Sequence, residues 1–288
     1  MRMFAATPAT RAHDHPDVGP WLTVLAEARR ALDDPFWARA VPDASGAPSS
    51  SPKPLPMLHD ARLTVDAARA DRFVRGLFGV AGKSGESAAA LRAAARGALL
   101  DAPALLEAAI RPDARCLDDW AAALGVDPPA LRAVAAVAVT PLLHACRRAW
   151  KDGLPTGWRE GYCPVCGAWP IFAEARGLER TRQLRCARCA GDWRTDWLRC
   201  PYCGNADHTR LGALVVADAP IETRKVETCE ACRGYVKSIT TLRATPVDEV
   251  TLVDLDTVEL DIAALERGYA RPNEPACVMR TRVVGAAP

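Results

Sequence analysis

The fold of this chain is decided by four short stretches: GYCPVCGAWP at residues 161–170, LRCARCAGDW at 184–193, LRCPYCGN at 198–205 and VETCEACRGYVKSI at 226–239. Each stretch contains one Cys-x-x-Cys pair, so together they hold eight of the 11 cysteines in the 288-residue chain. Two residues between cysteines allow one tight turn to direct both sulfurs at a single metal ion. Tetrahedral coordination by thiolates then requires two such turns for each ion.

A short repeat indicates which pairs belong together. The Cys-Pro-x-Cys-Gly pattern at Cys163 recurs at Cys200, and pairing consecutive turns gives two sites with 19 and 25 residues between their turns. This spacing is near or slightly beyond that of four-cysteine sites. Thiolates suit zinc and a rubredoxin-like iron alike, so the sequence leaves iron or zinc open. We predict two metal ions per chain, held by Cys163, Cys166, Cys186, Cys189, Cys200, Cys203, Cys229 and Cys232.

The composition is that of an ordinary globular protein, with 49% hydrophobic residues, 25% charged residues and a formal net charge of +2. This charge gives no strongly basic field of the kind that nucleic-acid binding requires. Residues 1–17 lack the apolar stretch of a secretory signal, and the longest apolar run, residues 133–139, is far shorter than the roughly 20 residues of a membrane helix. We therefore expect a cytoplasmic protein with no membrane span, in which paired cysteines are metal ligands rather than disulfides.

A change in the residue pattern near residue 157 predicts the domain organisation. Ala, Leu, Arg and Val recur at helical spacing before that point, whereas short strand-like segments follow it. Candidate helices are 19–32, 59–78, 86–110, 115–124 and 128–151. Asp127 followed by Pro128 predicts the start of the last helix, and Pro141 should kink or break it. The predicted domains are a helical domain at 1–156 with a Pro/Ser-rich loop at 41–56, a first four-cysteine module at 157–195, a second at 196–245, and a C-terminal helix and tail at 246–288. The predicted fold class is α+β, an all-helical N-terminal domain followed by two tandem rubredoxin-like or zinc-ribbon metal modules and a C-terminal helix.

Residues outside the eight cysteines offer no catalytic constellation. The five histidines are scattered, and a closed four-sulfur site has no open coordination position, so we expect no enzyme. Seven arginines between Arg176 and Arg199 could form a nucleic-acid surface. We favour a solvated face instead, because acidic residues such as Glu174 and Asp192 lie among them. The remaining cysteines are expected to be small buried apolar residues: Cys116, Cys146 and Cys277.

The four quoted stretches in tandem, together with the helical N-terminal half, resemble the formate dehydrogenase accessory protein family, FdhE. The resemblance is strongest over residues 158–245. It implies a cytoplasmic assembly and maturation factor rather than an enzyme, with rubredoxin-like modules that bind iron through the eight cysteines. It also implies that the chain binds the catalytic subunit of a molybdenum-containing formate dehydrogenase before export. A rubredoxin-like electron carrier and a zinc-ribbon nucleic-acid-binding protein remain the alternative functions.

Overall fold

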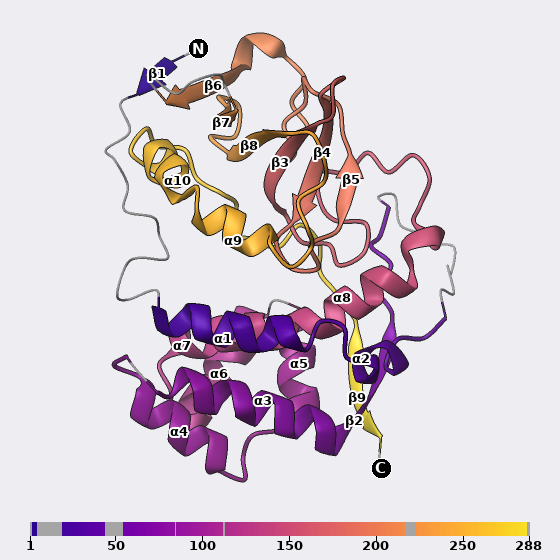
Figure 1. Cartoon of the computed structure of the whole chain (residues 1–288), viewed down its shortest axis with the longest axis vertical. Helices are drawn as coiled ribbons and strands as arrows, with labels where there is room; N and C mark the ends of the chain where they lie inside the picture. Colours follow the sequence, from indigo (N-terminus) through magenta and orange to yellow (C-terminus); the bar gives the residue numbers. More distant parts are fainter. Residues whose placement is uncertain are drawn as a thin grey trace. The chain divides into compact units, whose positions relative to one another are not determined.

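The computed structural model describes residues 2–4, 19–43, 54–83, 85–111, 113–216 and 223–286, and the chain divides into two compact units. The helical unit comprises His15–Ser50, Met57–Leu154 and Val278–Pro288. The cysteine unit comprises Met1–Asp14, Ser51–Pro56 and Pro155–Cys277 (Figure 1). His13, His15 and most of the predicted Pro/Ser-rich loop lie outside the described residues.

Aspartate caps set the starts of most helices in the helical unit. The side chains of Asp66, Asp101, Asp113 and Asp127 each accept a hydrogen bond from a backbone N–H in the first turn, which satisfies one of the groups that a helix start leaves unpaired. The cap predicted at Asp127, with Pro128 at the first helical position, is confirmed. The helices are α1 (Gly19–Arg30), α2 (Pro35–Arg39), α3 (Ala67–Ala81), α4 (Ala88–Arg96), α5 (Ala102–Ile110), α6 (Ala114–Leu124), α7 (Pro128–Ala138) and α8 (Thr140–Ala149).

Two predicted helices are each divided in two. The predicted helix 86–110 ends at its C-cap residue Gly97 and restarts after Asp101, whose side chain caps α5. Of the kink or break predicted at Pro141 the structure has the break, because α7 ends at Ala138 and α8 begins at Thr140. The run Pro128–Ala149 is the one segment of the described residues that is long and apolar enough to cross a membrane. Its most apolar window is 67% buried, as in the core helix of a globular unit.

The prediction of an all-helical N-terminal domain is wrong at residues 62–66. These residues form strand β2 (Arg62–Asp66), which pairs in parallel with β9 (Arg282–Ala286) near the other end of the chain. Leu63 and Val65 are buried while Arg62 and Thr64 are exposed, which is the two-residue period of a strand. The predicted C-terminal tail is therefore partly a strand, paired with a segment more than 200 residues away in sequence.

The cysteine unit is built on one seven-stranded sheet with the order β1-β6-β7-β8-β3-β4-β5. Its strands are β1 (Arg2–Phe4), β3 (Pro170–Arg176), β4 (Thr181–Cys186), β5 (Asp192–Arg194), β6 (Leu211–Val216), β7 (Arg224–Cys229) and β8 (Tyr235–Thr241). Each four-cysteine module contributes three antiparallel strands, and parallel pairing of β3 with β8 joins the two sets. The α+β class with two cysteine modules is confirmed, while the module boundary at residue 195 stays a prediction.

Two short helices cover one face of the sheet: α9 (Val250–Leu255) and α10 (Val258–Leu265) (Figure 1). Val250 of α9 packs against Ile171 and Phe172 of the first module, whereas α10 packs on the second module's strands. The single C-terminal helix predicted here is divided at Thr257. Its buried hydroxyl donates to the carbonyls of Val253 and Asp254 and so satisfies the end of α9. The core under α10 comprises Leu214, Val226, Tyr235, Leu260, Ala263, Ala264 and Tyr269.

A buried lysine fixes these helices to the sheet. Lys237 on β8 is fully buried, and its ammonium lies 2.6 Å from a carboxylate oxygen of Asp254 and 2.7 Å from one of Asp261. Arg271 contacts both carboxylates as well, at 3.0 Å and 2.7 Å. Sequence reasoning missed this network, although strand alternation places Lys237 on the same face as Tyr235 and so signals a buried cation.

Candidate metal centres

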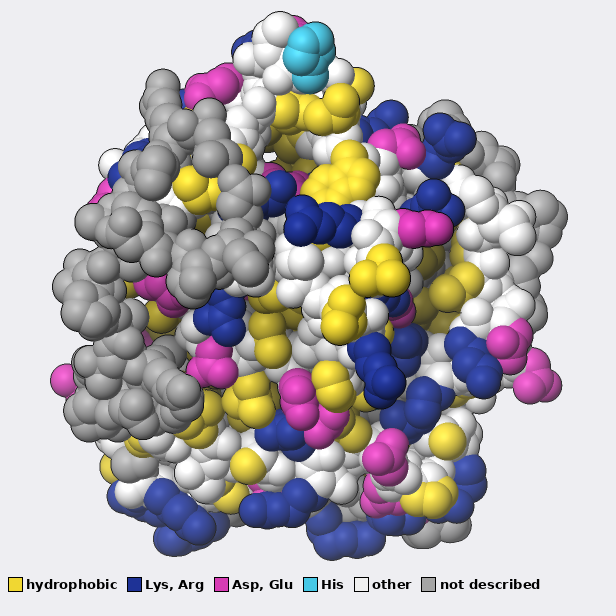
Figure 2. All heavy atoms as spheres, turned by 45° about the horizontal axis from the view of Figure 1, so that its top comes forward, with side chains coloured by type: hydrophobic (Ala, Val, Ile, Leu, Met, Phe, Trp, Pro, Cys, Tyr) yellow, Lys and Arg dark blue, Asp and Glu magenta, His cyan; other side chains and the backbone are white. Residues whose placement is uncertain are grey.

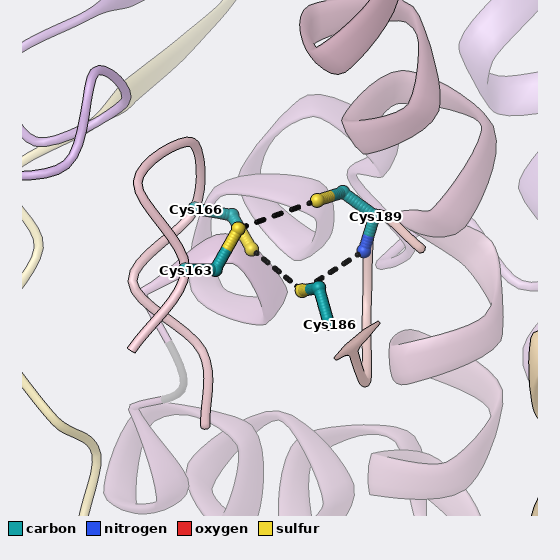
Figure 3. A group of neighbouring side chains, drawn as sticks. All are labelled: Cys163, Cys166, Cys186 and Cys189. Atoms are coloured by element: carbon teal, nitrogen blue, oxygen red, sulfur yellow. Dashed lines mark hydrogen bonds between the residues drawn. The ribbon is translucent and has the colours of Figure 1, made fainter. Parts of the chain in front are cut away.

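The first cluster gathers Cys163, Cys166, Cys186 and Cys189 (Figure 3). The first two lie in the turn before β3, Cys186 ends β4, and Cys189 lies in the turn before β5. The sulfurs of Cys163 and Cys189 are 3.6 Å apart, and those of Cys166 and Cys186 are 3.3 Å apart. All four side chains belong to residues that are at most 2% exposed.

The second cluster gathers Cys200, Cys203, Cys229 and Cys232. The sulfurs of Cys200 and Cys232 are 3.7 Å apart, and those of Cys203 and Cys229 are 3.8 Å apart. Unlike the first cluster, this one is open to solvent, because Cys203 and Cys232 are exposed. The structure thus brings the eight cysteines together in the consecutive pairing that the sequence predicts.

The donor set fits a tetrahedral metal ion. A metal–sulfur bond of about 2.3 Å in a tetrahedron places two sulfurs about 3.8 Å apart. The sulfur–sulfur separations of 3.3–3.8 Å lie at or slightly below this value, and within each cluster all four sulfurs lie within 4.8 Å of one another. Four thiolates suit zinc or a single iron and leave no open coordination position.

All four turns use the same backbone geometry. The residue after the second cysteine of each pair has a positive φ: 70° at Gly167, 54° at Ala190, 74° at Gly204 and 57° at Arg233. The amides of Gly167 and Gly204 donate to the carbonyls of Cys163 and Cys200, which closes each turn. Ala190 and Arg233 adopt this conformation at a cost of about 1–3 kcal/mol, which shows how strongly their surroundings impose the turn.

Backbone amides and burial determine how the thiols hold their protons. In the first cluster the amides of Arg188 and Cys189 donate to the sulfur of Cys186, at 3.3 Å and 3.4 Å. Burial raises the pKa of the Cys163 thiol, whereas hydrogen bonds from the neighbouring thiols lower the pKa of Cys166. In the second cluster burial raises the pKa of Cys232 to about 11. A cation would compete with the protons on Cys163 and Cys232, the two thiols whose raised pKa is given above.

Two arginines on β4 are buried in ion pairs rather than solvated. The side chains of Arg182 and Arg185 are 1% exposed. Arg182 lies 2.7 Å from Glu227 on β7, while Arg185 approaches Glu174, which is itself fully buried. The prediction of a solvated face is therefore wrong for Arg182 and Arg185, because folding buries both side chains beside carboxylates.

Aromatic side chains connect the turn of the first module with that of the second. The rings of Trp158, Tyr162, Trp169 and Tyr202 contact one another in sequence at centroid separations of 5.4, 6.1 and 5.3 Å. Gly234 is required beside them, because a Cβ there would lie 2.7 Å from the Tyr202 ring and 3.1 Å from the Cys232 sulfur. These contacts fix the second cluster against the start of the first module.

The other candidate residues lie away from the clusters or serve the core. His208 is exposed. Cys146 is buried as expected, but Cys116 and Cys277 are only partly buried. His59 and His144 are buried in the helical unit, where His59 lies 2.9 Å from Asp60.

Comparison with known proteins identifies the second module. Residues 198–277 match the family described as "FdhE, C-terminal domain", and this range contains the whole second cluster together with α9 and α10. Residues 198–277 of this chain are similar to the FdhE C-terminal domain. The resemblance to FdhE found in the sequence is confirmed.

Similarity to FdhE proteins extends to both sequence and fold. The chain is 32% identical over 117 residues to an FdhE homolog of Aquifex aeolicus, covering 40% of either chain. It is 31% identical over 117 residues to FdhE of Escherichia coli O127:H6, covering 40% of this chain and 37% of that one. The matched segments thus span less than half of these curated relatives. The crystal structure of FdhE from Pseudomonas aeruginosa shares the fold, with a TM-score of 0.55, 22% identity and coverage of 93% and 92%.

Proposed function

We propose that this protein is a cytoplasmic assembly factor that binds the catalytic subunit of a molybdenum-containing formate dehydrogenase before export. The observation that carries the proposal is the second cluster, where four sulfurs at coordination distances lie wholly within the segment that matches the FdhE C-terminal domain. The FdhE relatives and the shared fold support the same role.

We propose further that the eight cysteines hold two metal ions, iron or zinc. When bound, each ion supplies a cross-link between two turns and neutralises thiolate charge. The first ion would link the turn of Cys163 and Cys166 to the turn that follows β4, which holds Cys186 and Cys189. The second ion would link the turn of Cys200 and Cys203 to the turn that follows β7, which holds Cys229 and Cys232. Closed four-sulfur sites give no position for a substrate, which favours a binding role over catalysis.

An electron carrier is the second candidate, and one observation favours it. Cys203 and Cys232 are exposed, so an iron ion in this cluster would lie near solvent and could exchange electrons with another protein. A nucleic-acid-binding role has less support, because Arg182 and Arg185 are engaged in buried ion pairs.

Co-purification with the cognate catalytic subunit tests the proposed role. Metal-loaded protein should retain the subunit, and the Cys200→Ser/Cys203→Ser variant should retain less of it, because loss of one ion unfolds the second module locally. No binding by metal-loaded wild-type protein would refute the role. Reversible bleaching of a visible absorption band, together with no binding of the subunit, would favour the electron carrier.

A further inference from the structure

The second module's sheet has a cavity on the face opposite α10. Leu214, Val226 and Tyr235 point toward α10, so the alternate residues of the same strands occupy the other face. There, Ala213, Glu227 and Val236 are neighbours in register across β6, β7 and β8. These residues and the segment 197–202 line a cavity of about 170 Å³, next to Cys200 and Cys229.

Arg182 and Glu227, which line the cavity, each carry a buried polar atom that lacks a partner among the described residues. Arg182 binds one carboxylate oxygen of Glu227 through Nη2, at 2.7 Å. The Nε–H of Arg182 and the second oxygen of Glu227 are buried and have no hydrogen-bond partner within the described part of the chain. Burying such groups unpaired is unfavourable. A ligand that offers one acceptor and one donor, as a peptide group does, would satisfy both.

The rim is apolar and cationic. Trp197 and Leu198 are 40% and 62% exposed, which is unusual for large hydrophobic side chains. The Lys225 ammonium lies 5.4 Å from the Trp197 ring centre, and Arg199 is exposed beside them. Three cations and a single carboxylate therefore line the site. Figure 2 shows one face of the protein, on which hydrophobic and cationic side chains adjoin.

We propose that this cavity binds an extended segment of the partner protein, which inserts one apolar side chain and places an acidic residue against Lys225 and Arg199. The inference rests on the proposed function, in which this chain binds another protein. The segment's peptide group would accept from Arg182 Nε–H and donate to Glu227.

The size and charge of the cavity select this occupant. A volume of about 170 Å³ is close to the roughly 150 Å³ that holds a benzene ring, and well below the roughly 300–1,000 Å³ of cofactor sites. Three cations against one carboxylate leave the lining positive, which favours an acidic residue beside the apolar one. Cys200 and Cys229 lie in the wall, so the metal that holds their turns would also hold the site.

Affinity measurements with the cognate catalytic subunit test the inference. Lys225→Glu reverses the charge of the rim, and Ala213→Phe fills the cavity from β6. Each should weaken binding by about ten-fold or more. The matched control is Arg224→Glu, which makes the same charge change one residue earlier in β7, on the opposite face. It should bind within about two-fold of wild type, since only a difference well below ten-fold is expected away from a binding site.

Metal content and thermal unfolding should match wild type for Lys225→Glu, so the test stands even where Ala213→Phe does not fold. Normal binding by Lys225→Glu would overturn the inference and leave the proposed function intact. Failure of wild-type protein to bind the subunit would overturn both. A result with RNA would also overturn the inference. In that result, a single-stranded RNA oligonucleotide competes with the subunit for the wild-type protein, and Lys225→Glu abolishes this competition without changing the affinity for the subunit.

Discussion

Replacing Lys237 by Met should destabilise the cysteine unit strongly. The side chain is fully buried, and its ammonium contacts Asp254 and Asp261 at 2.6 Å and 2.7 Å. It also donates to the backbone carbonyl of Asp254, at 2.7 Å. Methionine preserves most of the length of the side chain but removes the charge and all three contacts, so two carboxylates remain in a mostly buried site.

The expected loss follows from the burial of the carboxylates. Removing one partner of a buried ion pair costs about 3–5 kcal/mol. Asp254 and Asp261 are 19% and 18% exposed and keep Arg271, which places the loss at the lower end. For a domain of about 150 residues each kcal/mol lowers the melting temperature by about 2–4 °C. A loss of about 3 kcal/mol therefore predicts a decrease of about 6–12 °C.

Circular dichroism of metal-loaded protein, followed with temperature, measures this decrease. The matched control is Lys225→Met, because the Lys225 ammonium lies 5.4 Å from the Trp197 ring centre and forms no ion pair with the described residues. It should cost about 1 kcal/mol or less. Adding Asp261→Asn to Lys237→Met should restore part of the stability, since one uncompensated charge is removed. A melting temperature unchanged by Lys237→Met would refute the role of this network in fixing α9 and α10.

Three further predictions concern the clusters. A chelator should remove the second ion well before the first, because Cys203 and Cys232 are exposed whereas the cysteines of the first cluster are at most 2% exposed. Gly234→Val should lower metal content toward one ion per chain, because even a Cβ would lie 2.7 Å from the Tyr202 ring and 3.1 Å from a ligand sulfur. Metal affinity should fall as pH falls, because burial raises the pKa of Cys232 to about 11 and protons then compete with the cation.

Each of these predictions has a distinct measurement. Chelator release followed with a metal-sensitive dye should show two phases of equal amplitude, and one phase would contradict the difference in burial. Elemental analysis of Gly234→Val should be compared with Gly76→Val in α3, where a Cβ would meet no atom within 4 Å, and equal metal content would contradict the steric argument. Metal retained unchanged from about pH 7 to about pH 4 would contradict proton competition at the thiolates.

The sequence predicted the parts of this fold that depend on local pattern. The Cys-Pro-x-Cys-Gly repeat was sufficient to pair Cys163 with the cysteines that follow it, because each turn is a local structure and consecutive turns are close in the chain. Asp127 and Pro128 likewise predicted a helix start, because capping involves only neighbouring residues. These features need no knowledge of which segments meet in space.

The features that sequence reasoning missed depend on distant pairing. The strand β2 pairs with β9, more than 200 residues away, so Leu63 and Val65 alone could not distinguish a strand from the start of a helix. Parallel pairing of β3 with β8 joins the modules into one sheet and buries Arg182 and Arg185 between charged neighbours. A list of charges along the chain gives no sign of this, because burial is set by the sheet.

The number of metal ions per chain tests the central claim most directly. Elemental analysis of anaerobically purified protein should find two ions, one for each four-cysteine cluster. The Cys200→Ser/Cys203→Ser variant should retain one ion, held by the buried first cluster. Fewer than one ion per chain in the wild-type protein, or the same content in the variant as in the wild type, would contradict the account.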